Sequence, residues 1–145
     1  MSIKAFLSQN KTIQVGMDAD SWGDVIQQAA KPLISGGFIT PDYPQAVINN
    51  TIEYGAYYVF DEGIAIPHAR PECGVISDCF SMVTLTRPMS INGSDPVDII
   101  VMFGGANSDS HITEGIASIV GLLEQEETLS QIRRATTIDE ILGLL

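Results

Sequence analysis

The sequence predicts an α/β fold in which a mixed central β-sheet is flanked by helices on both faces, as a three-layer sandwich. Amphipathic helical patterns occupy both ends of the chain, and short strand patterns fill its middle. Residues 97–103 (VDIIVMF) form an almost continuous apolar run, which is typical of a central strand covered on both faces. We expect one domain over residues 1–145, since no repeat or linker divides the chain.

The first two predicted helices have recognisable start signals. Ser21 is an expected N-cap with Asp24 three residues later, and apolar residues then recur on one helical face. Pro32 lies inside this pattern and predicts a kink or an early end. Thr40 as N-cap and Pro41 in the first turn predict a second helix.

The strand patterns come mainly from the middle of the chain. A short first strand is expected at 12–15, and two more, at 56–60 and 64–66, flank an acidic turn. Residues 80–86 (FSMVTLT) predict another strand, which we expect to end at the Arg-Pro pair 87–88 because proline cannot donate a ladder hydrogen bond.

The C-terminal third predicts three helices. The first begins within 107–110 and is expected to bury one face, made of Ile112, Ile116, Ile119, Val120 and Leu123. A short helix follows near 129–134. The last begins at Thr137, where Glu140 at the third position completes a capping box.

The charge of the chain limits its partners. It carries 18 acidic and 7 basic residues, a net charge of −11. Nucleic acid and anionic membranes both require a basic protein surface, so neither is expected as a partner. A partner with a basic face is favoured instead. Because no apolar stretch has membrane-spanning length and the first residues lack a signal peptide's apolar region, we expect a cytoplasmic protein.

One short stretch combines a strand pattern with chemically active side chains. In GIAIPHAR, residues 63–70, an apolar run suited to a sheet interior ends at Pro67. His68 follows directly, and Arg70 comes two residues later. A titratable ring and a cation whose donors suit phosphate are therefore expected together at a strand end.

The only other histidine, His111, also follows a predicted strand, and with Ser110 it opens a helix. Ligand sites gather at strand ends in open α/β sheets, and the amino end of a helix attracts anions. Two histidines meeting in one cleft would indicate histidine chemistry on an anionic group. On local pattern alone, a histidine in a proline-flanked loop such as His68 is usually a polar turn residue, and His111 fits an ordinary helix start.

Other chemistries find less support. The GxGxxG, GxxxxGK[ST] and GxSxG motifs are absent, so neither a nucleotide nor any other cofactor is expected. Cys73 and Cys79 have a spacing that fits no common zinc motif, and we expect both to be reduced thiols. A metal site formed by His68, His111 and Glu114 is the remaining alternative, because two imidazoles and a carboxylate form a known ligand set.

GIAIPHAR with the following Pro71-Glu72 resembles the active-site segment of the mannitol/fructose-type enzyme IIA domains of the bacterial phosphotransferase system. The resemblance extends along almost the whole chain. The segments EYGAYYVF (53–60) and DPVDIIV (95–101), together with the Ser110-His111 helix start, are most similar to the ascorbate-specific branch.

This resemblance implies a phosphocarrier. By resemblance, His68 takes a phosphoryl group from the phosphohistidine of the carrier protein HPr and passes it to a cysteine of the cognate enzyme IIB. The membrane component, enzyme IIC, is then an indirect partner, and ascorbate or a related sugar acid is the substrate. His111 corresponds to the family's second histidine, which hydrogen-bonds the phosphoryl oxygens. Glu53 matches an acidic family position, and Ser110 belongs to the similar helix start; both are candidate binding residues.

The chain also departs from the family pattern. Mannitol-type members carry an arginine just before the acidic residue, whereas residues 50–52 here are NTI, and Arg70 is the candidate substitute. Asp61 stands where the family usually has a small residue. The sequence leaves a second function open, a regulatory enzyme IIA that signals through its phosphorylation state rather than feeding a transporter. It also leaves the oligomeric state open.

Overall fold

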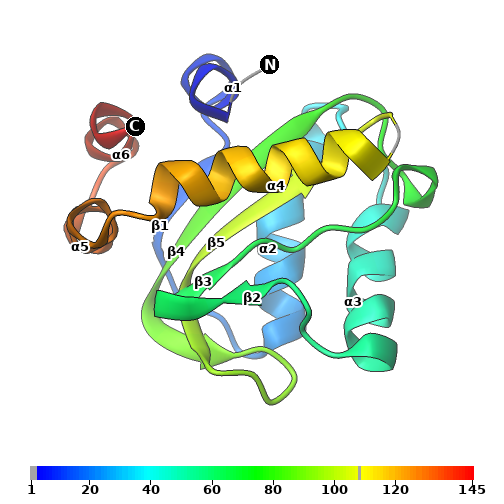
Figure 1. The fold of residues 1–145 in the computed structure, drawn as a ribbon, viewed down its shortest axis with the longest axis horizontal. Helices are drawn as coiled ribbons and strands as arrows, with labels where there is room; N and C mark the ends of the chain where they lie inside the picture. The colour runs from blue at the N-terminus through cyan, green and yellow to red at the C-terminus, as the bar shows by residue number, and fades with distance from the viewer. Residues whose placement is uncertain (1–2, 108) are drawn as a thin grey trace.

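Five strands form one mixed sheet. The computed structural model describes residues 3–107 and 109–145, with side chains described outside 109–114. The strands are β1 (Ile13–Met17), β2 (Val59–Phe60), β3 (Ile64–Ala65), β4 (Cys79–Ser90) and β5 (Pro96–Gly104). Their order across the sheet is β1-β4-β5-β3-β2 (Figure 1). The apolar run at 97–103 is therefore the central strand, as its composition predicts.

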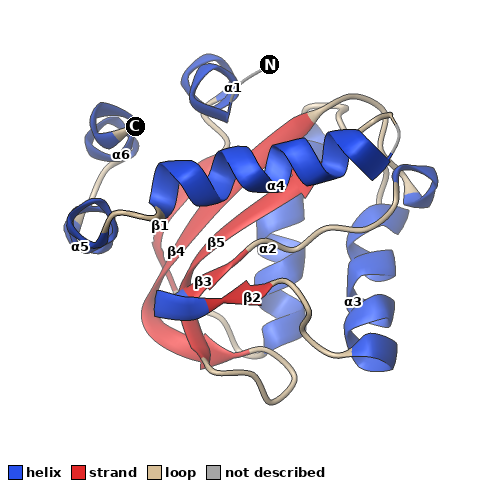
Figure 2. Ribbon diagram, in the orientation of Figure 1, coloured by secondary structure: helices blue, strands red, loops and turns tan. Residues whose placement is uncertain are grey.

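Helices cover both faces of this sheet. They are α1 (Ile3–Asn10), α2 (Trp22–Ser35), α3 (Asp42–Tyr54), α4 (Asp109–Leu123), α5 (Glu126–Arg134) and α6 (Ile138–Leu144). Figure 2 shows α4 crossing one face, with α2 and α3 behind the other. Helices α1 and α5 both contact α4, and α6 contacts α1 and α5. The predicted three-layer α/β arrangement is confirmed.

Strand direction decides which loops share an edge. β1 is parallel to β4, and β3 is parallel to β5, while β4 and β5 are antiparallel. The carboxyl ends of β3 and β5 therefore lie at one edge, and those of β1 and β4 at the opposite edge. The loop that carries His68 leaves β3 at the first edge, and the chain leaves β5 toward α4 at the same edge.

Helix α4 approaches the sheet closely over two aromatic rings. Phe80 of β4 is the register partner of Phe103 of β5, and their ring centroids lie 5.2 Å apart. Gly115 of α4 lies directly over the second ring, since a Cβ built there would be 2.4 Å from the Phe103 side chain. Glycine is the residue that allows this close contact between helix and sheet.

The buried side of α4 agrees only in part with the predicted face. Ile119 and Leu123 are fully buried, as predicted, whereas Val120 is 37% exposed, so its assignment to the core is wrong. Residues four apart lie on one helix face, and Val120 is rotated about 100° from Ile119. Ile112 lies outside the residues whose side chains are described.

Two predicted N-caps are confirmed. The Ser21 Oγ accepts a hydrogen bond from the Asp24 backbone N–H at 3.2 Å, and Asp24 Oδ2 accepts one from the Asp20 N–H. At the start of α6, the Thr137 Oγ1 accepts from the Glu140 N–H at 3.1 Å. Both caps satisfy backbone donors that have no partner within the helix.

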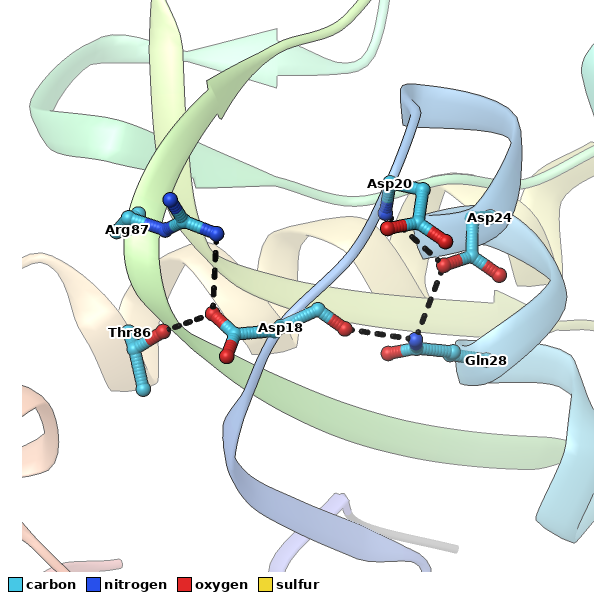
Figure 3. Close-up of polar contacts among 6 residues, drawn as sticks. All are labelled: Asp18, Asp20, Asp24, Gln28, Thr86 and Arg87. Carbon is cyan, nitrogen blue, oxygen red and sulfur yellow. Dashed lines mark hydrogen bonds and ion pairs between the residues drawn. The ribbon is translucent and has the colours of Figure 1, made fainter.

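A polar cluster joins the start of α2 to the carboxyl ends of β1 and β4 (Figure 3). Gln28 Nε2 donates to the Asp18 carbonyl and to Asp24 Oδ2, at 3.0 and 3.2 Å. Thr86 Oγ1 donates to Asp18 Oδ1 at 2.5 Å, and Arg87 lies 3.7 Å from the same oxygen. These residues lie at the edge opposite the His68 loop.

Helix α2 does not end early at Pro32, contrary to one of the two predicted effects, but continues to Ser35. Proline leaves the carbonyl four residues earlier, that of Gln28, without its helical donor. Gln14 Nε2 donates to this carbonyl at 2.6 Å. A side chain from the adjacent strand β1 thus replaces the missing helical hydrogen bond.

The predicted role of Thr40 as side-chain N-cap is wrong. Helix α3 has Pro41 at its N-cap position and no side-chain cap bond. Thr40 contributes its backbone instead, because its carbonyl accepts from the Tyr43 N–H and its own N–H donates to the Gly74 carbonyl. Within the described part of the chain, its Oγ1 is buried without a hydrogen-bond partner.

Strand β4 also runs past its predicted end, through residues 87–88 to Ser90. Its register against β5 shifts between Thr84 and Met89, as at a β-bulge. A bulge leaves residues out of the ladder, so Pro88 needs no backbone donor there.

Candidate functional site

His68 lies just beyond the carboxyl end of β3, in a loop that the neighbouring strand holds. β3 ends at Ala65, close to the end that Pro67 predicts. The contact with β5 nevertheless extends further, because the Phe103 N–H donates to the Pro67 carbonyl at 3.1 Å. Pro67 is buried and His68 half-buried, so the chain leaves the core at the histidine.

The imidazole of His68 is oriented by its own loop. Its Nδ1 lies 2.7 Å from the Ile66 carbonyl oxygen. A carbonyl only accepts hydrogen bonds, so this contact assigns the proton to Nδ1 and leaves a lone pair on Nε2. Burial lowers the pKa of His68 below its ordinary value of 6.5, and the hydrogen bond to Ile66 opposes that effect. The ring is therefore neutral near pH 7.

Tyr43 of α3 holds the other side of the loop from within the core. Its hydroxyl donates to the Phe103 carbonyl at 2.7 Å and accepts from the Ala69 N–H at 3.0 Å. The side chain is fully buried, and this burial raises its pKa well above the ordinary value of 10.0. The hydroxyl consequently remains protonated and ties the His68 loop, strand β5 and helix α3 together.

Tyr57 contacts His68 directly. Its hydroxyl donates to the His68 backbone carbonyl at 2.7 Å. The two rings meet edge to face, with centroids 5.4 Å apart and planes at 90°. His68 is thus fixed through its backbone and through its ring.

The strand predicted at 56–60 is shorter than expected, because residues 57–58 form a turn before β2. Tyr58 still supports the site, since its carbonyl accepts from the Ile66 N–H at 2.9 Å. Its buried hydroxyl lies 2.7 Å from Thr51 Oγ1 in α3, and burial raises the pKa of Tyr58 to about 12. Helix α3 is therefore bonded to the segments on both sides of β3.

The two charged candidates are exposed. Arg70 Nε donates to Glu72 Oε1 at 2.7 Å, and the two side chains are 67% and 66% exposed. Glu53 lies in the last turn of α3 and is also exposed. Arg70 follows His68 in the same loop. The side chains of Arg70 and Glu53 are both accessible to solvent.

The predicted second half of the site lies at the start of α4. This helix begins at Asp109, so Ser110 and His111 belong to its first turn. Because β3 and β5 are parallel neighbours, the chain reaches this turn from the same sheet edge as the His68 loop. The side chains of Ser110, His111 and Glu114 lie outside those described, and the metal alternative rests on two of them.

The described residues contain neither a cluster of metal-ligating side chains nor a membrane-spanning helix. Among the described residues, no group of three or more His, Cys, Asp or Glu side chains could hold a metal ion. In the same part of the chain, no helix combines the length and apolar character needed to cross a bilayer. Neither cysteine is in a disulfide; Cys79 is buried and Cys73 half-buried.

Sequence reasoning missed Tyr43 and Tyr57. Both contact the His68 loop from positions 26 and 11 residues away along the chain. The stretch EYGAYY places several tyrosines shortly before β3, but it does not indicate which of their rings contacts the histidine. Nothing local distinguishes Tyr43 from any other apolar residue on the inner face of α3.

The fold and the site together define a class: an α/β domain that presents a neutral, oriented imidazole at the carboxyl edge of its sheet. Residues 6–145 match the family described as "Phosphoenolpyruvate-dependent sugar phosphotransferase system, EIIA 2". The chain belongs to this family of enzyme IIA components of the phosphotransferase system (PTS), as its resemblance predicts.

The chain is similar to named relatives over nearly its whole length. It is 34% identical to the ascorbate-specific PTS system EIIA component of Escherichia coli K12, covering 100% of this chain and 96% of the relative. PtxA from Streptococcus mutans has a crystal structure with a TM-score of 0.92 at 33% identity, over 99% of this chain and 92% of that one.

Two mannitol proteins of Escherichia coli share the fold. The solution structure of the mannitol-specific cryptic enzyme IIA CmtB gives a TM-score of 0.84 at 31% identity, over 96% of this chain and 97% of that one. A complex of the mannitol enzyme IIA with phosphorylated enzyme IIB gives 0.81 at 23% identity, over 92% and 93%. The second likeness shows the fold alone.

Proposed function

We propose that this protein is a phosphocarrier of the sugar phosphotransferase system and that Nε2 of His68 carries the phosphoryl group. The observation that supports this most strongly is the bond from Nδ1–H to the Ile66 carbonyl, at 2.7 Å. It leaves one ring nitrogen with a free lone pair in a side chain that is half-buried and held by its loop. A neutral imidazole in that form is a nucleophile near neutral pH.

The transfer needs little from the protein beyond position and charge. The Nε2 lone pair forms a bond to the phosphorus of phospho-HPr, while the donor's N–P bond breaks and its electron pair returns to the donor imidazole. Positive charge develops on the His68 ring during this step. The Ile66 carbonyl oxygen accepts a hydrogen bond from Nδ1–H, and this hydrogen bond stabilises the positive charge on the ring. No proton has to leave the ring.

The onward step uses the same atom in reverse. A cysteine thiolate of enzyme IIB attacks the phosphorus, the S–P bond forms, and the Nε2–P bond breaks with its electron pair returning to the ring. Phosphorylated enzyme IIB is in the mannitol complex named above, and it serves here as the analogy for this partner. Ascorbate or a related sugar acid is the proposed transported substrate, because the chain is similar to ascorbate-specific relatives.

The remaining site residues have supporting roles in this proposal. His111 and Ser110 donate hydrogen bonds to the phosphoryl oxygens from the first turn of α4, where the helix dipole also favours an anion. Arg70, exposed in the His68 loop, and Glu53, exposed in the last turn of α3, contact the docked partner or its phosphoryl group. The net charge of −11 favours partners with a basic face, so raising salt is expected to slow transfer.

Incubation with phosphoenolpyruvate, enzyme I and HPr tests the proposal. We expect the wild-type protein to be labelled, His68→Ala to lose all label, and His111→Ala to be labelled more slowly with its fold retained. Circular dichroism establishes that each variant is folded. Full labelling of His68→Ala would overturn the assignment of the phosphorylated residue.

A second assay addresses the transport role. Labelled protein is mixed with the enzyme IIB of an ascorbate system in a single-turnover experiment. We expect the label to pass rapidly to that enzyme. Enzyme IIB from a mannitol system is the matched control and is expected to accept more slowly. Stable label in the presence of every enzyme IIB tried would contradict a role in transport.

A further inference from the structure

Resting on the proposed function, we infer that Tyr57 is a positioning residue for phosphoryl transfer, which holds the His68 imidazole with Nε2 toward the partner. Two contacts with the same residue carry the inference. The Tyr57 hydroxyl donates to the His68 backbone carbonyl at 2.7 Å. The rings meet edge to face at 90°, with centroids 5.4 Å apart, a geometry that aromatic pairs favour.

Tyr57 is itself well anchored, although 47% of its surface is exposed. Its ring packs edge to face on that of Tyr58, with centroids 5.1 Å apart, and Tyr58 is fully buried. The contacts run from Thr51 of helix α3 through Tyr58 and Tyr57 to His68, so the ring beside the imidazole is part of the folded scaffold.

The hydroxyl is suited to donate throughout the reaction. Burial raises the pKa of Tyr57 above its ordinary value of 10.0, and the nearby side chain of Asn50 opposes that effect. The phenol is therefore protonated at neutral pH and donates to the carbonyl of His68. Its exposed part lies beside the half-buried imidazole, where a docking protein approaches.

The two sides of the imidazole are thus fixed by different groups. The Nδ1–H bond to Ile66 holds one side, and the Tyr57 ring limits rotation on the other. Phosphoryl transfer depends strongly on the alignment of nucleophile and phosphorus. Free rotation of the His68 ring therefore lowers the rate of transfer within the complex with phospho-HPr. Loss of Tyr57 contacts should therefore reduce kcat more than it changes KM for phospho-HPr.

Two variants separate the contacts. Tyr57→Phe removes the hydroxyl and keeps the ring, and Tyr57→Leu removes both. Relative to wild type, we expect kcat for acceptance from phospho-HPr to fall roughly 3- to 10-fold in the first and about 10- to 100-fold in the second, with KM changed less than about 2-fold. Tyr54 is the last residue of α3 and is 70% exposed, so Tyr54→Phe and Tyr54→Leu are the matched controls and should leave both constants unchanged.

The nitrogen-15 chemical shifts of the His68 ring report its tautomer, and a general loss of stability would not change them. In wild type the shifts should show one tautomer, protonated at Nδ1. In Tyr57→Leu they should move toward the average of the two tautomers, while the remaining amide spectrum stays folded.

The outcomes are distinguishable. If wild type accepts phosphate on His68 and both Tyr57 variants keep its kcat and its nitrogen shifts, the positioning role is wrong and the phosphocarrier role stands. If KM rises while kcat is kept, Tyr57 contacts the partner and does not position the ring, which also overturns the inference. If wild-type His68 is never labelled, the proposed function itself fails.

Discussion

Nδ1 of His68 lies 2.7 Å from the carbonyl oxygen of Ile66, a residue only two positions earlier in the chain. Pro67 lies between them, and it fixes its own φ and donates no backbone hydrogen bond. The loop thus selects one tautomer of the imidazole before any partner arrives. Preorganisation of this kind is what a reaction governed by positioning requires.

Lowering the pH should destabilise the fold through His68. Burial lowers the pKa of the folded-state imidazole below 6.5, so the unfolded chain binds this proton more readily. The stabilisation is fully present above pH 6.5 and is lost as pH falls from there through the lowered folded-state pKa. Urea unfolding of wild type and His68→Gln from pH 7.5 to 5 measures this. The difference between the two proteins should shift in favour of His68→Gln on acidification; a constant difference would contradict the prediction.

Removing the Tyr43 hydroxyl should destabilise the protein without changing its shape. Tyr43→Phe leaves the Phe103 carbonyl and the Ala69 N–H without their bonds in a buried place. We expect the free energy of unfolding to fall by about 2–6 kcal/mol, because each of the two buried groups left unpaired costs roughly 1–3 kcal/mol. Urea unfolding measures the change, and Tyr54→Phe, on an exposed face, should stay within about 0.5 kcal/mol of wild type. Equal stabilities for the two variants would contradict the role of Tyr43.

Gly115 and Gly121 provide a matched pair in one helix. A Cβ at Gly115 would lie 2.4 Å from the Phe103 ring, whereas nothing lies within 4 Å of one at Gly121. Gly115→Ala should lower the free energy of unfolding by about 1–3 kcal/mol through overpacking. Gly121→Ala should raise it by up to about 1 kcal/mol, because alanine has the higher helix propensity. Thermal unfolding should therefore shift in opposite directions. The same sign for both would show that α4 is not seated closely on Phe103.

The two cysteines should differ sharply in reactivity. Burial raises the pKa of Cys79 to about 12, and its side chain is fully enclosed, whereas Cys73 is half-buried. Since the thiolate is the reactive form, iodoacetamide should modify Cys73 in the native protein and Cys79 only after unfolding. Peptide mass spectrometry follows both sites. Rapid native modification of Cys79 would contradict its burial.

Local signals in the sequence were sufficient for many elements. The apolar run at 97–103 predicts the central strand, and the Ser21 and Thr137 caps predict two helix starts, because each depends on residues close in sequence. The position of His68 beyond a strand end follows from Pro67 in the same way. The phosphoryl chemistry was predicted from family resemblance and not from these patterns.

Two of the wrong predictions share a physical cause, which is a contact with another element of the fold. Helix α2 continues past Pro32 because Gln14, on another element, donates to the carbonyl that proline leaves free. β4 continues past residue 88 because a shift of register against β5 accommodates the proline. The tyrosine supports of His68 were missed for the same reason, since Tyr43 reaches a carbonyl 60 residues away. Neither propensity nor periodicity contains such contacts.

Identifying the phosphorylated nitrogen tests the central claim most directly. Long-range proton–nitrogen NMR of the uniformly labelled protein, before and after incubation with phosphoenolpyruvate, enzyme I and HPr, separates the two ring nitrogens of each histidine. We expect phosphorus on Nε2 of His68 with the Nδ1 proton retained toward Ile66. Phosphorus on Nδ1 of His68, or on His111, would contradict the account.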